Sequence, residues 1–284
     1  MSVRWVGGTL YVSDTGNSRV RVVDRRLAIL TTIGRHGSGP GELRGPTQLD
    51  VKGKTIGVLD VGNSRINLYD LQGEYRDAIR LPLRVLSFGL LNDSNVVVPD
   101  ETGEHGFTIM GLDGARERRG VRPAVLTDVP VAYPNAREEL RGTGIDRVAV
   151  LGEDVVVADN VTGAIGLFEL GGAPLATFSP PAELMQRVFQ RFRRIDESFG
   201  VRNAFTPVYN DMVALEDGRL LLLMPVDDVI ALLVDPRSFE VVIVEAASDA
   251  HDRGANAGFS VAMQGREMVF AGWSGLAFFA IDAR

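Results

Sequence analysis

The sequence contains no cysteine and few aromatic residues, which make up 7% of its 284 positions. The absence of cysteine excludes disulfide bonds, thiolate zinc sites and cysteine nucleophiles. No apolar run approaches the ~18 residues that a membrane span requires, and Met1–Leu10 lacks the charged-then-apolar order of a secretory signal. We therefore expect a soluble chain. Its compartment stays open: cytoplasmic if the printed chain is as translated, periplasmic if Met1 is a trimmed start.

Basic residues are outnumbered by acidic ones, and the formal net charge is −7. An acidic protein repels phosphate backbones and anionic lipid headgroups, so nucleic acid is not an expected partner. Hydrophobic residues make up 45% and charged residues 24%, with 32 glycines. This composition is typical of a globular protein rather than a disordered or membrane-spanning one.

An internal repeat is the most informative feature of the chain. Leu10–Val20 aligns without a gap to Ile56–Ile66, at an offset of 46 residues, and Asp24 then matches Asp70. Short β-branched runs separated by Gly, Asn and Asp turns at such a period indicate four-stranded propeller blades. About six periods fill the chain.

Weaker copies of the same pattern continue to the C-terminus, each a β-rich run, a polar turn and a second run that ends in an acidic residue. The sequence therefore predicts an all-β fold, a single six-bladed β-propeller domain of four-stranded antiparallel blades. The predicted blades cover about residues 1–34, 46–82, 84–120, 143–179, 207–246 and 258–284.

The motif Asp-x-Gly-Asn-Ser-Arg, followed by a strand and then Asp, resembles the NHL repeat, and segment 34–46 resembles the linker of bacterial six-bladed NHL-type propellers. The match is specific over the first third of the chain and architectural afterwards. The resemblance implies structural roles between blades for six residues. They are Asp14, Asn17, Arg19, Asp60, Asn63 and Arg65.

The closure of the ring is predicted to be irregular. Aligning Val3–Gly8 with Leu49–Lys54 makes the N-terminal residues the innermost strand of the first blade, and the last blade ends at Asp282 without an outermost strand. An unpaired edge is a template for strand addition by another chain. Missing sequence and a wrong register are the two alternatives.

Two insertions interrupt the period, at residues 121–144 and 179–203. The second contains a predicted helix near 181–197, in which Leu184, Val188, Phe192 and Ile195 share one stripe and three arginines share another. The helix either packs on the propeller or docks a protein partner or a membrane surface. The residues proposed for partner binding are Arg187, Arg191, Arg194, Arg35, His36 and Arg44.

Familiar catalytic motifs are missing: there is no G-x-S-x-G elbow, HExxH, Walker loop or EF-hand loop. His36, His105 and His251 are all predicted on loops of one face, where they form a weak candidate zinc site. A calcium site in the central channel would draw on acidic and amide side chains. The candidates are Asp159, Asn160, Asn203, Asn210 and Asp211.

Two functions remain open after these exclusions. The leading hypothesis is a non-enzymatic protein-recognition or scaffold propeller, a subunit of a larger assembly, with no cofactor. The alternative is a small-molecule hydrolase or lyase that uses calcium or zinc in the channel. An RNA-binding rim is disfavoured because acidic residues interrupt it. That rim would contain Arg35, Arg44, Arg116, Arg118, Arg119 and Arg122.

Overall fold

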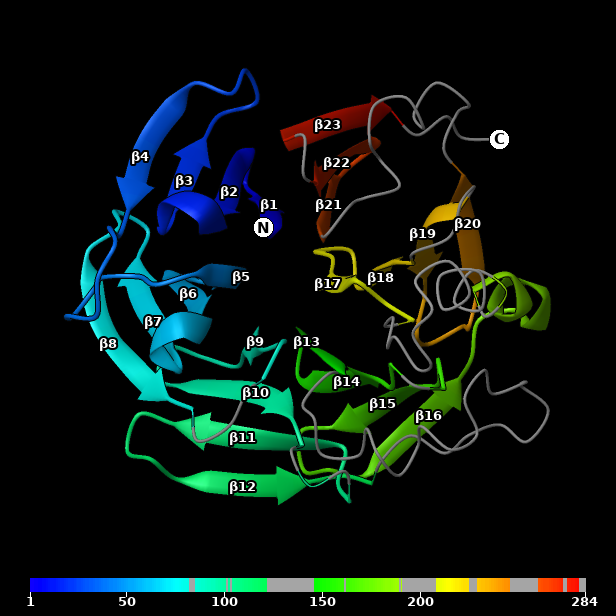
Figure 1. The fold of residues 1–284 in the computed structure, drawn as a ribbon. Helices are drawn as coiled ribbons and strands as arrows, with labels where there is room; N and C mark the ends of the chain where they lie inside the picture. Colours follow the sequence, from blue (N-terminus) through cyan, green and yellow to red (C-terminus); the bar gives the residue numbers. More distant parts are fainter. Residues whose placement is uncertain are drawn as a thin grey trace, which may run out of the picture.

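Six antiparallel β-sheets are arranged in a ring around a central channel in the computed structural model (Figure 1). Among the described residues, five sheets have four strands and the last has three. The structure describes residues 1–81, 85–100, 102, 104–121, 146–160, 162–188, 190, 208–224, 229–245, 260–272 and 275–280.

Each sheet is one blade, and its strands follow one another in chain order from the channel outward. Blade 1 contains β1 (Val3–Val6), β2 (Thr9–Asp14), β3 (Arg19–Val23) and β4 (Ile29–Ile33). Blade 2 contains β5 (Pro46–Lys52), β6 (Thr55–Asp60), β7 (Arg65–Asp70) and β8 (Tyr75–Arg80). Blade 3 contains β9 (Gly89–Leu90), β10 (Asn95–Pro99), β11 (Phe107–Gly111) and β12 (Arg116–Arg119).

The second half of the ring repeats this order. Blade 4 contains β13 (Arg147–Leu151), β14 (Asp154–Ala158), β15 (Ile165–Glu169) and β16 (Pro174–Phe178). Blade 5 contains β17 (Asp211–Ala214), β18 (Leu220–Leu223), β19 (Val229–Val234) and β20 (Val241–Glu245). Blade 6 contains β21 (Ser260–Gln264), β22 (Glu267–Gly272) and β23 (Gly275–Ala280).

The polarity of a strand depends on its distance from the channel. Second strands such as β10, β14 and β18 are continuous apolar runs whose described side chains are mostly buried, because neighbouring blades cover both faces of each sheet. The outermost strand β12, Arg-Glu-Arg-Arg, is charged and largely exposed. A charged outer strand also discourages edge-to-edge pairing with other chains.

The hydrophobic core is divided into six clusters, each of which lies between two neighbouring blades. The cluster between blades 1 and 2, for example, contains Val20 and Ile33 on one side and Leu49 and Tyr69 on the other. Each blade therefore depends on both neighbours for burial of its apolar faces, and the apolar area buried between blades is the main stabilising contribution.

The repeated motif gives the same local structure twice. A single 3-10 turn follows β2 and β6, at η1 (Thr15–Asn17) and η2 (Val61–Asn63), and a serine in the left-handed conformation ends each turn, with φ of 53° at Ser18 and 52° at Ser64. Short polar side chains suit such turns because they bond to nearby main-chain groups. The likeness of the two segments thus extends to their backbone geometry.

Among the described residues, blade 6 and blade 1 share no sheet and meet through packing. β1 is the innermost strand of blade 1, as the alignment of the repeat predicted, and Val3 and Trp5 pack with Ala262 and Val269. In the described part of blade 6, β23 is the outermost strand. Whether an added strand covers that edge stays a prediction.

Residues 182–188 are helical, within the segment where a helix was predicted, and they lie beside the outer strands of blades 4 and 5 (Figure 1). Leu184, Met185 and Val188 are buried in the cluster between these two blades. This part of the helix therefore packs on the propeller. Phe192, Ile195 and the rest of the insertion lie outside the described residues, and no helix in the described ranges has the length and apolarity to cross a membrane.

Two equivalent glycines of the repeat provide a matched pair of substitutions. A side chain at Gly62 would overlap the main-chain carbonyl of Arg44, which accepts the Gly62 N–H at 2.9 Å, whereas a side chain at Gly16 would meet nothing within 4 Å. We expect Gly62→Ala to lower the free energy of unfolding by about 1–3 kcal/mol, and Gly16→Ala to leave it unchanged or raise it slightly. Urea denaturation of both variants measures this, and equal effects would contradict the prediction.

Candidate functional site

The repeat-motif residues form hydrogen bonds within their turns, and those of blade 2 also contact the linker from blade 1. Asp14 accepts hydrogen bonds from Asn17 and Arg19, at 2.8 and 2.9 Å, and Asp60 accepts from Asn63 at 2.6 Å. Arg65 also donates to three carbonyl groups of the linker before blade 2. The first copy of the motif thus stabilises its own turn, and the second copy also holds the linker against blade 2.

Two of the three histidines, His36 and His105, belong to the described structure, and they have different neighbours. His36 is exposed and its Nδ1 lies 3.2 Å from the hydroxyl of Ser18, while Nδ1 of His105 lies 3.9 Å from Asp100. No group of three His, Asp or Glu side chains suited to a metal ion occurs among the described residues. His251 lies outside them.

Two of the proposed calcium ligands, Asn160 and Asp211, contact a neighbouring blade or cross the channel. Asn160 holds the main chain of Tyr209 by two hydrogen bonds, of 2.7 and 3.2 Å. Asp159 is buried and accepts the main-chain N–H of Thr162 at 3.0 Å. Asp211 lies at the channel, and Asn203 falls outside the described residues. The remaining candidate, Asn210, precedes β17 directly.

A ring of polar side chains surrounds the channel at the start of the innermost strands. One residue from each blade contacts the main chain of the next blade, at distances from 2.9 to 3.4 Å. We call this ring the collar. Its members are Ser2, Gln48, Ser87, Arg147, Asp211 and Ser260.

The hydrogen bonds of the collar connect all six blades. Ser260 accepts the N–H of Val3, which joins the last blade to the first at 3.0 Å, and Ser2 accepts the N–H of Leu49. Because the innermost strand of each blade has no neighbour on its channel side, these N–H groups would otherwise be unsatisfied. The collar therefore closes the ring in the absence of a shared sheet.

An ion pair crosses the channel and includes one collar residue, Asp211. The guanidinium group of Arg4, in blade 1, donates to both carboxylate oxygens of Asp211, in blade 5, at 3.0 and 3.2 Å. Both side chains are only 6% exposed. Ser260 and the main-chain N–H groups of Met212 and Val261 also donate to Asp211. Both carboxylate oxygens of Asp211 therefore accept hydrogen bonds that join blades 1, 5 and 6.

The pKa shifts in this region arise because positive groups are buried close to the carboxylate of Asp211. Burial lowers the pKa of Arg147, and the negative charges of Asp211 and Asp146 counteract that effect. Burial likewise lowers the pKa of the Met1 amino group, again opposed by Asp211. Asp211 thus compensates the nearby positive groups, as buried charges require.

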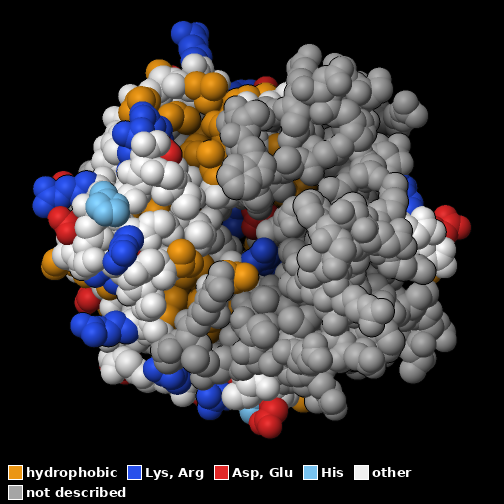
Figure 2. All heavy atoms as spheres, viewed as in Figure 1, with side chains coloured by type: hydrophobic (Ala, Val, Ile, Leu, Met, Phe, Trp, Pro, Cys, Tyr) orange, Lys and Arg blue, Asp and Glu red, His pale blue; other side chains and the backbone are white. Residues whose placement is uncertain are grey.

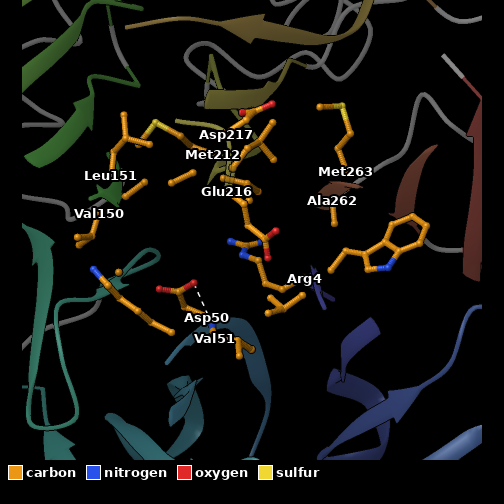
Figure 3. Close-up of a pocket in the computed structure, with 18 of the residues that line it drawn as sticks. Arg4, Asp50, Val51, Val150, Leu151, Met212, Glu216, Asp217, Ala262 and Met263 are labelled. Atoms are coloured by element: carbon orange, nitrogen blue, oxygen red, sulfur yellow. Dashed lines mark hydrogen bonds between the residues drawn. The ribbon is translucent and has the colours of Figure 1, made fainter. Parts of the chain in front are cut away.

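The central channel widens into a pocket at the opposite end of the innermost strands, where the hairpin turns lie. Figure 3 shows Arg4 and Asp50 pointing toward the middle of this pocket, with Met212 and Met263 on its wall. Glu216, on the turn after β17, also lines it. The cavity has a volume of about 610 Å³. The inter-blade loops, which carry the predicted binding residues, lie at the other face of the ring.

The sequence analysis missed this pocket, although a signal for it was present. Arg4 and Asp50 occupy equivalent positions in the aligned segments Val3–Gly8 and Leu49–Lys54. Charged residues inside otherwise apolar innermost strands require a reason, because unpaired charges are rarely buried. Only the ring geometry shows that both side chains enter one cavity.

The arginines proposed for partner or RNA binding are dispersed. Arg35 is 82% exposed and pairs with Glu42, and Arg44 and His36 are exposed beside it. On the described part of the face in Figure 2, lysine and arginine side chains form separate spots rather than one patch. Arg118 and Arg119 pair with Asp100 and Glu117. Of the others, Arg116 lies on β12, Arg187 lies on the helix, and Arg122, Arg191 and Arg194 fall outside the described residues.

The ion pair across the channel yields a double-mutant test. We expect Arg4→Met and Asp211→Asn each to lower the free energy of unfolding by about 3–5 kcal/mol, because each leaves a buried group unpaired. The double variant should lose less than the sum of the two. Urea denaturation measures all three. The exposed pair Arg219 and Asp217 is the control, and its expected coupling energy is below about 1 kcal/mol. Additive losses of stability at Arg4 and Asp211 would contradict the prediction.

Comparison with known proteins agrees with the ring of six sheets. Residues 1–104 match a family model described as a 6-bladed beta-propeller. No curated protein matches the sequence. The fold resembles virginiamycin B lyase from Staphylococcus aureus, with 11% identity, a TM-score of 0.55, and coverage of 100% of this chain and 84% of the lyase.

Two further solved structures have the same architecture. The β-propeller domain of Cps50 (Swd1) from Myceliophteria thermophila is 14% identical, with a TM-score of 0.56 and coverage of 99% of this chain and 82% of that one. A chain of a nidogen/laminin complex is 12% identical, with a TM-score of 0.59 and coverage of 96% and 89%. At these identities the likeness concerns the fold alone. The chain is a six-bladed β-propeller.

Proposed function

We propose that this propeller is a non-enzymatic recognition protein that binds a protein partner, a role suited to a subunit of a larger assembly. The observation that carries the proposal is the commitment of the channel carboxylate. Asp211 accepts from Arg4 through both oxygens and receives further donors from Ser260 and two main-chain N–H groups. A carboxylate with these partners is not free to hold a metal ion or to act as a base.

The alternative function, a metal-dependent hydrolase or lyase, has some support from similarity of fold. A virginiamycin B lyase is among the similar structures, as is a chain from a nidogen/laminin complex. Propellers host both catalysis and binding, so the fold favours neither. The contacts around Arg4 and Asp211 favour binding, since a hydrolytic metal would need open carboxylate or imidazole ligands where these side chains are already paired.

The face that carries the inter-blade loops is the proposed partner surface. Arg35, His36 and Arg44 are exposed there on the linker between blades 1 and 2. The linker backbone is fixed by the Arg65 contacts and by the hydrogen bond from the Arg44 N–H to Asp60, at 2.6 Å. Exposed side chains on a rigid backbone lose little entropy on binding. Such a surface suits recognition of an acidic segment on a partner protein.

Metal titration distinguishes the two functions. We expect the midpoint of thermal unfolding to stay constant when calcium or zinc chloride is added, because Asp211 is committed to Arg4 and the described residues contain no group of three His, Asp or Glu side chains suited to a metal ion. A specific site at 100-fold excess over its Kd would add about 2.7 kcal/mol, which raises Tm by roughly 5–10 °C. Differential scanning calorimetry with EDTA as the reference measures this. A metal-dependent rise of that size would overturn the proposal.

A charge-reversal experiment tests the partner surface. The full chain is first used for affinity capture from its native host, and the recovered partner is then purified for binding measurements. We expect Arg35→Glu combined with Arg44→Glu to weaken binding at least about tenfold, because charged contacts are lost and repulsion is gained. The control is Arg76→Glu on the outer strand β8, which reverses one charge in the same way but away from the linker. Equal losses in both variants, or no stoichiometric partner, would contradict the proposal.

A further inference from the structure

The pocket at the hairpin-turn end of the channel is a second feature with no role in the proposed function. It is formed entirely by described residues, chiefly the ends of the innermost strands and the turns that follow them. Its volume of about 610 Å³ lies within the usual range of small-molecule sites. Arg4, which is paired with Asp211, is among the residues that line it.

The wall of the pocket is apolar and adaptable. Val51, Val150 and Leu151 line one side and Met212 and Met263 line another (Figure 3). Methionine side chains are flexible and polarisable, and they accommodate apolar groups of different shape. This wall suits the hydrocarbon or aromatic body of a ligand.

The positive charges in the pocket are already engaged. Arg4 is held by both oxygens of Asp211 and also donates to the carbonyl of Val3 at 2.8 Å. Lys52 donates to the carbonyl of Gly152 at 3.4 Å, which bridges blades 2 and 4 across the mouth. Neither cation is the natural partner of a ligand anion, because each would first have to give up its present acceptor.

Two carboxylates in the pocket have no cationic partner in the described structure. Asp50 accepts only main-chain N–H groups, from Val51 at 3.0 Å and Leu90 at 2.8 Å, which leaves lone pairs on both oxygens. Glu216, on the turn after β17, is exposed and has no hydrogen bond or ion pair among the described residues. Asp217 differs from both because Arg219 neutralises it.

From this arrangement we propose that the pocket binds an amphipathic organic cation, with its ammonium or guanidinium group at Asp50 and Glu216 and its apolar body against the methionine-lined wall. A free amine and a lysine or arginine side chain presented by a protein loop share this chemistry. The net charge of −7 attracts either one. The site is independent of the loop face, so it does not rest on the partner surface proposed above.

Isothermal titration of the full chain with three probes of similar shape tests the proposal. The probes are phenethylamine, the neutral 2-phenylethanol and the anion phenylacetate. We expect phenethylamine to bind at least about tenfold more tightly than the other two, because one charge-assisted hydrogen bond distinguishes them. Equal binding of the three probes, preference for phenylacetate, or no binding at millimolar concentration would overturn the proposal.

Variants locate the cation within the pocket. Asp50→Asn and Glu216→Gln should each weaken amine binding several-fold, and Lys52→Met should strengthen it, because it removes a like charge. Glu216 makes no contact on which folding depends, so its substitution stays informative even if Asp50→Asn unfolds the chain. Glu153→Gln is the matched control, an exposed acid on the turn between β13 and β14 outside the pocket. The assignment would be overturned if Glu216→Gln left amine binding unchanged, and equally if Glu153→Gln weakened it.

A second titration distinguishes the sources of the cation. The probe is a capped tripeptide, acetyl-Leu-Lys-Leu-amide, with acetyl-Leu-Met-Leu-amide as its neutral counterpart. Tighter binding of the lysine peptide than of phenethylamine assigns the pocket to a protein side chain, and the reverse order assigns it to a free amine. If the lysine and methionine peptides bind equally while phenethylamine shows no preference over 2-phenylethanol, the cation site is overturned, whatever the result at the loop face.

Discussion

The main-chain N–H groups of the innermost strands impose the constraint on which this propeller depends. These strands have a free edge toward the channel, and buried N–H groups without acceptors would destabilise the ring. Five side chains of the collar supply acceptors to the next blade, including Ser260 to Val3 across the closure, and Arg147 instead donates to the carbonyl of Tyr209. The collar therefore places hydroxyl, amide and charged groups at the centre of an otherwise apolar molecule.

The collar also determines what the channel can do. Asp211 serves the collar, the ion pair with Arg4 and the compensation of Arg147, so its charge is balanced at this closure of polar contacts between blades. The free carboxylate of Asp50 lies beyond this closure, on the side of the hairpin turns. Among the described residues, the pocket with its free carboxylate thus lies at one face, while the linker with Arg35 and Arg44 presents cations at the other.

The sequence predicted the parts of the fold in which local pattern and tertiary environment agree. The motif at Asp14 and Asp60 repeats both its residues and its 3-10 turn, because short polar side chains determine that turn locally. The position of β1 as an innermost strand followed from the same alignment. The buried stripe of the helix, with Leu184 and Val188, was visible in its spacing.

The candidate site could not be predicted in the same way, because its residues are brought together by ring geometry. Arg4 and Asp211 are far apart in sequence and lie in blades that are not neighbours, so no periodicity relates them. The histidines show the opposite case. The sequence predicts all three on loops of one face, but the two described ones, His36 and His105, have different neighbours because their blades occupy different positions around the ring.

By itself, the sequence determined the number of blades, the strand order within them and the turns of the first two repeats, since those depend on local periodicity and turn chemistry. The tertiary structure alone decided which charges are paired and which are free. Asp50 and Asp211 are both acids on innermost strands, but only Asp211 lies where an arginine from across the channel reaches it. The physical reason is that charge pairing depends on distance in space, and distance across a ring is independent of distance along the chain.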